Sequence, residues 1–150
     1  SEMCIRDSIK AMCRYKNIKF VLIAPNELQV PDYIIKDVLE PSGTKYVQVE
    51  SMDAVMPDLD VLYMTRIQRE RFFSAEEYLK YENAFILDLD KLENAKSDLT
   101  IMHPLPRVNE IATNVDDDPR AKYFEQALNG KYVRMALIMT LLKWGGQLEY

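Results

Sequence analysis

Cysteine, glycine and histidine are all scarce in this 150-residue chain, which has two cysteines, four glycines and one histidine. The two cysteines, Cys4 and Cys13, make no disulfide framework and lack the ligand spacing of a zinc site. A reducing compartment, the cytoplasm, is therefore expected. No apolar run approaches the roughly 20 residues that are needed to cross a bilayer, so no membrane partner is expected.

The charge balance is mildly acidic, with 19 lysines and arginines against 24 aspartates and glutamates and a formal net charge of -5. Surfaces that bind nucleic acid are usually basic, so nucleic acid is not an expected partner. Hydrophobic residues make up 48% of the chain and charged residues 29%, a composition that is typical of one globular domain with its own core.

Apolar segments of two different periods alternate along the chain, as they do in α/β proteins. Short strands are predicted at 18–23, 45–49, 59–64, 85–87 and 99–102. Helices are predicted at 31–42, 51–56, 74–81 and 91–95, and from 116 to about 144 with a break near Asn129 and Gly130. Residues 9–15 are typical of the end of a helix. The short connections favour a doubly wound, mainly parallel sheet that is flanked by helices, as in Rossmann-like domains.

The last predicted helix is apolar on nearly every side between Val133 and Trp144. A helix that covers one face of a sheet should keep a polar face toward water. Two explanations remain open. Either the helix is buried within the core, or it packs against a partner surface that this chain does not supply.

The segment that follows the third strand is rich in arginine. Ligands of doubly wound sheets bind at the carboxyl ends of the strands, and here residues 65–72 read Thr-Arg-Ile-Gln-Arg-Glu-Arg-Phe. A guanidinium group can pair with both oxygens of a carboxylate or phosphate, and strand alternation directs Arg66 and Gln68 to the same side. The segment is either an anion-binding site or a solvated charged loop in which Glu70 pairs locally.

The segment that follows the fourth strand is His-Pro-Leu-Pro-Arg, residues 103–107. Its two prolines stiffen the backbone, so its carbonyl groups suit hydrogen bonding to an amino group, and an X–Pro bond permits a cis peptide. His103 is either a structural hydrogen-bonding residue, the more common case at a strand end, or an acid–base residue. No second imidazole or thiolate lies nearby, so a metal site is not predicted.

These two segments closely resemble the aspartate carbamoyltransferase family. Residues 64–72 and 102–111 carry its two central motifs, residues 121–126 and 133–136 also agree, and the resemblance covers roughly 8–142. It implies the aspartate-binding domain of an enzyme that transfers the carbamoyl group of carbamoyl phosphate to L-aspartate in pyrimidine biosynthesis. The products are N-carbamoyl-L-aspartate and phosphate, and neither a metal ion nor an organic cofactor is implied.

The resemblance also implies roles for individual residues. Arg66 and Gln68 would hold the carboxylates of aspartate. Leu105 and Pro106 would present backbone groups to the carbamoyl group of carbamoyl phosphate across a cis peptide, and Arg71 would belong to a loop that closes over the substrates. The family's phosphate loop and carbonyl-polarising residues belong to an upstream domain that this sequence lacks. We therefore expect no complete catalytic set and no activity from this chain alone.

The expected organisation is a leader over residues 1–8 that is not native, followed by the aspartate-binding domain over residues 9–150. Residues 3–8 match what a common sequencing-library adaptor encodes in one frame, and they replace the family's Gly-Arg-Thr-Val-His-Ser stretch. A missing N-terminal carbamoyl-phosphate-binding domain would account for the apolar last helix. The resemblance further implies a homotrimer and, in some relatives, a regulatory chain.

Two other functions remain open. The chain could be a non-catalytic module that binds a dicarboxylate or forms an oligomer contact, because the phosphate-binding half is absent. It could also be a paralogue similar to ornithine carbamoyltransferase. That branch has His-Cys-Leu-Pro at the turn where this chain has Pro104, and it lacks the Thr-Arg-Ile-Gln pattern. Binding of succinate but not of ornithine would separate the two.

Overall fold

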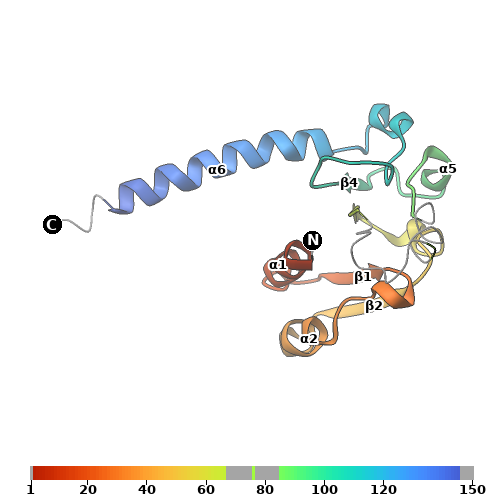
Figure 1. Cartoon of the computed structure of the whole chain (residues 1–150), viewed down its shortest axis with the longest axis horizontal. Coiled ribbons are helices and arrows are strands. Elements are labelled where there is room, and N and C mark those ends of the chain that lie inside the picture. The colour runs from red at the N-terminus through yellow and green to blue at the C-terminus, as the bar shows by residue number, and fades with distance from the viewer. Residues whose placement is uncertain (1, 67–75, 77–84, 146–150) are drawn as a thin grey trace. The chain divides into compact units, whose positions relative to one another are not determined.

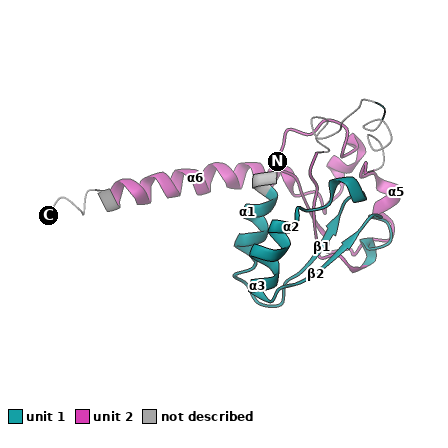
Figure 2. Cartoon of the chain, turned by 60° about the horizontal axis from the view of Figure 1, so that its bottom comes forward, with its two compact units in different colours: residues 1–57, 68–82 teal, residues 58–67, 83–150 magenta. Residues whose placement is uncertain are grey.

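The structure is a computed structural model that describes residues 2–66, 76 and 85–145 (Figure 1). The chain divides into two compact units, the first containing residues 1–57 and the second residues 58–67 and 83–150 (Figure 2). Each unit contains one pair of parallel strands together with helices. The predicted α/β class with parallel strand pairing is therefore confirmed.

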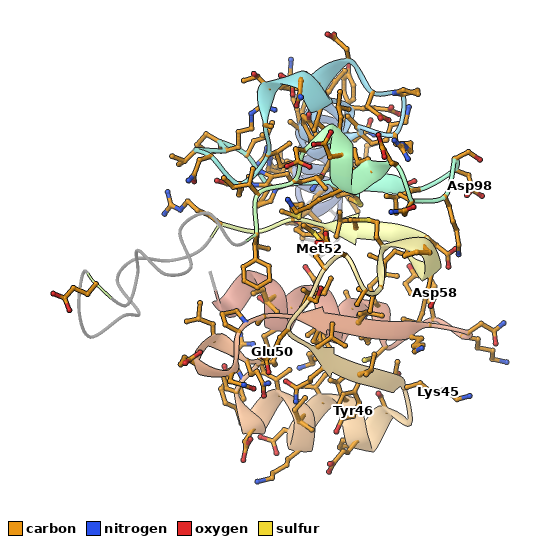
Figure 3. The ribbon with its side chains drawn as sticks, turned by 90° about the vertical axis from the view of Figure 1, so that its right-hand side faces the viewer. Lys45, Tyr46, Glu50, Met52, Asp58 and Asp98 are labelled. Atoms are coloured by element: carbon orange, nitrogen blue, oxygen red, sulfur yellow. The ribbon has the colours of Figure 1, made fainter. Side chains whose placement is uncertain are left out.

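The first unit is built around the parallel strands β1 (Lys19–Ile23) and β2 (Lys45–Val49), both of which the sequence predicts. Lys45 begins β2, and Glu50 follows its other end (Figure 3). The helical segments of this unit are α1 (Glu2–Met12), η1 (Asn26–Leu28), α2 (Asp32–Ile34), η2 (Ile35–Leu39) and α3 (Glu40–Ser42). A 3-10 helix, η3 (Met56–Asp58), contains the boundary between the two units.

The core of the first unit joins its helices to its strands. Four buried residues of α1, α2 and η2 form it, namely Ile9, Ile34, Ile35 and Leu39, and partly buried side chains of β1 and β2 pack against them. The helical run ends at Gly43, whose φ of 67° is left-handed. Glycine has no Cβ that would clash in this conformation, which is why it is common just after a helix.

The second unit contains β3 (Val61–Tyr63), α5 (Leu89–Leu92), β4 (Thr100–Met102), η5 (Thr113–Asp117) and α6 (Tyr123–Gly145). Strands β3 and β4 are parallel, with Leu62 opposite Ile101 and Tyr63 opposite Met102. Leu62 and Ile101 are both buried, so the pairing is held by the core of this unit.

Three predicted details of the second unit are wrong. Residues 85–87 form no strand, because only Leu87 makes an isolated bridge, to Ile111. The last helix begins at Tyr123 rather than at 116, because residues 113–117 form a 3-10 helix first. That helix also continues through Asn129 and Gly130. A glycine inside a helix costs only about 1 kcal/mol relative to alanine, which is too little to break a helix of this length.

The apolar side chains of α6 are exposed beyond its first turns. Leu128, Val133, Leu137 and Leu142 keep between 49% and 72% of their surface accessible. The first explanation for this apolar helix, burial within the core, is therefore wrong. Among the described residues, no helix combines the length and the apolar character that crossing a bilayer requires.

Candidate functional site

The candidate site lies at the edge of the sheet where β3 and β4 end. Because these strands are parallel and Tyr63 is opposite Met102, the chain leaves both strands at the same edge. The Met64 N–H extends the pairing by donating to the Met102 carbonyl at 2.8 Å. Arg66, which is exposed, follows one strand end, and the turn 103–107 follows the other. The two segments therefore emerge side by side from one pair of strands.

Two of the predicted site residues, Gln68 and Arg71, lie outside the described residues, and so does Glu70. Their roles stay predictions. Within the part of the chain that the structure describes, no three side chains of the metal-ligating kinds come together.

The polar groups that follow β1 and β2 bind one another. Asn26 donates from Nδ2 to Oε1 of Glu50 at 2.7 Å, and Gln29 donates from Nε2 to Oδ1 of Asn26 at 2.8 Å. These contacts are exposed and tie the segments after the two strands together. They are explained by local structure, so the segment after β1 is not a candidate site.

The turn 103–107 has an unusual backbone. The Leu105–Pro106 peptide is cis, as predicted, and Leu105 has a φ of 45°. A left-handed conformation costs a residue other than glycine roughly 1–2 kcal/mol, so surrounding interactions have to maintain it. One of them is a hydrogen bond of 2.8 Å from the Leu105 N–H to Nδ1 of His103.

His103 and Glu110 form a buried pair beside this turn, with only 2% and 5% of their surfaces exposed. Nε2 of His103 lies 2.7 Å from Oε1 of Glu110. The other carboxylate oxygen, Oε2, accepts the backbone N–H groups of Val108 and Asn109 at 3.0 and 3.1 Å. His103 thus has the structural role that the sequence favoured over acid–base chemistry.

Glu110 is ionised in this environment. Burial alone would raise the pKa of its carboxyl group, but the backbone N–H groups of Glu110 and Val108 and the hydrogen bond to His103 together lower that pKa. Glu110 was not predicted from the sequence. The available signal was its position shortly after the only histidine of the sequence.

A second cluster fixes the far end of the turn. Arg107 donates from both terminal nitrogens to the two carboxylate oxygens of Asp116, and the hydroxyl of Tyr123 donates to Asp116 as well. The Arg107 guanidinium also lies 5.7 Å from the centre of the Tyr123 ring. The hydrogen bonds from Arg107 and Tyr123 lower the pKa of Asp116 to about 2, while burial and Asp116 raise the pKa of Tyr123 to about 12.

The first turns of α6 are attached to the same edge of the sheet. The His103 N–H donates to Oε1 of Gln126 at 2.9 Å, and Nε2 of Gln126 is 3.4 Å from the hydroxyl of Tyr63. Gln126 therefore contacts residues at the ends of both β3 and β4. Its interactions add a third anchor to the turn.

Comparison with known proteins identifies this arrangement. A family model described as "Aspartate/ornithine carbamoyltransferase, Asp/Orn binding domain" matches residues 3–141. The chain belongs to the aspartate/ornithine carbamoyltransferase family. The resemblance inferred from the two sequence motifs is thereby confirmed.

Individual family members agree with this assignment. The aspartate carbamoyltransferase catalytic subunit of Lachnoclostridium phytofermentans is 56% identical over 138 residues, which are 92% of this chain and 45% of that protein. The catalytic subunit of the M. jannaschii aspartate transcarbamoylase has a TM-score of 0.85 at 40% identity, over 93% of this chain and 46% of its own. The Trypanosoma cruzi aspartate transcarbamoylase in complex with carbamoyl phosphate and aspartate has a TM-score of 0.79 at 36% identity, over 89% of this chain and 44% of its own. The chain thus spans less than half the length of these carbamoyltransferases.

Proposed function

We propose that this chain is the aspartate-binding half of an enzyme that transfers the carbamoyl group of carbamoyl phosphate to L-aspartate. The parallel pairing of Tyr63 with Met102 carries this proposal, because it brings the arginine-containing segment and the proline-rich turn out at one sheet edge. The names of the family members similar to this chain also support it.

Each group at this edge has a chemical task. The guanidinium of Arg66, together with Gln68, binds a carboxylate of aspartate through paired hydrogen bonds. The backbone carbonyls of Leu105 and Pro106 accept hydrogen bonds from the amide of carbamoyl phosphate, and Arg71 belongs to the segment that closes over both substrates. The aspartate amine then attacks the carbamoyl carbon, the bond to the phosphate oxygen breaks, and phosphate leaves with the proton that the amine releases. Positioning and charge stabilisation supply most of the catalysis in such a reaction, without a metal ion or cofactor.

The rest of the active site comes from a second, N-terminal half that binds the phosphate of carbamoyl phosphate. The chain spans 45% of the length of its Lachnoclostridium phytofermentans relative, which leaves room for such a half. The exposed apolar side chains of α6 supply a surface for it. The assembled enzyme is a cytoplasmic homotrimer that can also bind a regulatory chain.

A non-catalytic dicarboxylate-binding module is the second candidate, and the same partial coverage favours it. It shares the aspartate site of the first proposal but predicts no turnover in any combination. A paralogue similar to ornithine carbamoyltransferase has less support, because Pro104 occupies the position of the cysteine in that branch.

Two experiments test the proposal. The first follows the amide signals of the isotopically labelled chain by NMR as L-aspartate, succinate or ornithine is added. The two dicarboxylates should shift the signals of residues 65–71 at millimolar concentrations, and ornithine should not. If no signal shifts at tens of millimolar dicarboxylate, the proposed dicarboxylate-binding site is refuted.

The second experiment mixes this chain with the separately expressed N-terminal half of the Lachnoclostridium phytofermentans relative. Carbamoyl aspartate formation should appear only in the mixture. Arg66→Lys replaces the planar fork with a single ammonium group, so we expect its KM for aspartate to rise roughly tenfold or more. Arg14→Lys changes an exposed arginine elsewhere and is the matched control. Normal activity of the Arg66 variant would contradict the assigned role, and binding without turnover would favour the module.

A further inference from the structure

His103 uses both of its ring nitrogens within the protein. Nε2 contacts the Glu110 carboxylate, and Nδ1 accepts the Leu105 N–H. With 2% of its surface exposed, the residue has no ring atom left for a substrate. The assignment of its ring proton follows from these two partners.

The Glu110 carboxylate is ionised and can only accept hydrogen bonds, so Nε2 must carry a proton. The Leu105 N–H can only donate, so Nδ1 must accept this hydrogen bond and carries no proton. The contacts therefore select one neutral tautomer, with the proton on Nε2. In this tautomer the imidazole connects a fixed carboxylate to the one residue of the turn that has a left-handed backbone.

We propose that His103 is a positioning residue for carbamoyl phosphate: Glu110 fixes its tautomer and orientation, and its Nδ1 holds the Leu105 backbone so that the adjacent carbonyls face the substrate. This inference rests on the proposed function of the turn. Holding the Leu105 N–H maintains a conformation that the residue does not favour by itself. A carbonyl held in this way needs no reorganisation when the ligand binds, which strengthens binding.

Two variants separate the two hydrogen bonds of the ring. In His103→Asn, the amide oxygen can occupy the position of Nδ1 and still accept the Leu105 N–H, but the donor to Glu110 is lost. In His103→Gln, the longer amide can place its nitrogen at the position of Nε2 and still donate to Glu110, but the acceptor for Leu105 is lost. Each variant therefore removes one of the two hydrogen bonds of the His103 ring and keeps the other.

If His103 is a positioning residue, the variant that is less stable should not be the variant that binds carbamoyl phosphate less well. The asparagine variant should be the less stable in urea unfolding of the chain, because it leaves a buried carboxylate short of a donor. The glutamine variant should bind less well. In the mixture with the N-terminal half, its KM for carbamoyl phosphate should rise roughly five- to tenfold, whereas that of the asparagine variant should stay within about twofold. A merely structural histidine would make the less stable variant the weaker binder too.

Leu92→Ala is the matched control, because Leu92 is buried in α5 of the same unit and is not part of the turn. It should lower stability without changing this KM. The ring proton is observed directly in long-range nitrogen–proton NMR spectra of the wild-type chain, which should show a protonated Nε2 and a bare Nδ1. A proton on Nδ1 instead would refute the proposal even if one variant does not fold.

The failure of this inference can be told apart from that of the proposed function. N-(phosphonacetyl)-L-aspartic acid, which is bound in a Trypanosoma cruzi aspartate transcarbamoylase structure, serves as the probe. If the wild-type mixture binds the probe but the proton is on Nδ1, or stability and binding fall in the same order, only the positioning role is refuted. If the wild-type mixture does not bind the probe, the proposed function and the positioning role are refuted together.

Discussion

Replacing Asp116 with asparagine should destabilise the second unit, because Asp116 is the acceptor that Arg107 and Tyr123 share. Their hydrogen bonds lower the pKa of Asp116 from 3.8 to about 2. At about 1.4 kcal/mol for each pKa unit, this change corresponds to at most about 2.5 kcal/mol of stability at neutral pH. The Asp116 side chain is 27% exposed, so water screens part of the interaction. We expect a loss of about 1–2 kcal/mol.

The loss of stability in Asp116→Asn should also depend on pH. Because folding lowers the pKa of Asp116, its stabilisation is complete well above pH 3.8 and is lost as the pH falls through about 2. The difference in unfolding free energy between the wild-type chain and Asp116→Asn should therefore be largest at pH 7. It should fall to roughly half by pH 3 and become small by pH 2.

Urea unfolding followed by circular dichroism measures both quantities. Asp117→Asn is the matched control, since Asp117 is exposed in the same 3-10 helix and its replacement removes the same charge. If Asp116→Asn costs no more than Asp117→Asn at pH 7, or if its effect is the same at pH 7 and pH 2, the shared carboxylate does not stabilise the turn.

Two further changes probe the neighbouring contacts. Tyr123→Phe removes one hydrogen bond to Asp116 and should cost about 1 kcal/mol in urea unfolding at pH 7. Because folding raises the Tyr123 pKa from 10.0 to about 12, its contribution is complete below pH 10 and is lost as the pH rises through about 12. The variant should lack that alkaline loss, and an identical profile would contradict the assignment. Gln126→Leu leaves the His103 N–H without its acceptor and should cost about 1–3 kcal/mol, with faster hydrogen exchange at that amide. Unchanged exchange would show that this bond does not hold the turn.

The four strands that form, β1 to β4, were predictable because their side chains are locally distinctive. The nearly continuous apolar run at β1 and the alternation at β2 can be found without knowledge of the partner strand. The same holds for the stop at Gly43 and for the stiff turn around Leu105. Asn129 and Gly130 misled the prediction because they favour turns locally, whereas the hydrogen-bonded helix around them tolerates both.

The supporting residues of the site could not be predicted in the same way. Glu110, Asp116 and Tyr123 meet His103 and Arg107 only after the chain has folded. No periodicity links a buried carboxylate to its donor, since the partners are set by tertiary contacts rather than by spacing. The residues proposed to touch the substrates were therefore named from the sequence motifs, whereas the partners of His103 and Arg107 were not.

The pairing of Leu62 with Ile101 makes the geometry of the site sensitive to insertions and deletions. Adding one residue within β4 would turn the core-facing side chains outward and would advance everything after it by about 3.3 Å along the strand direction. The proline-rich turn would then no longer emerge level with Arg66. Loops on the opposite edge of the sheet can change length without this effect, so variation in length should be tolerated before these strands and not inside them.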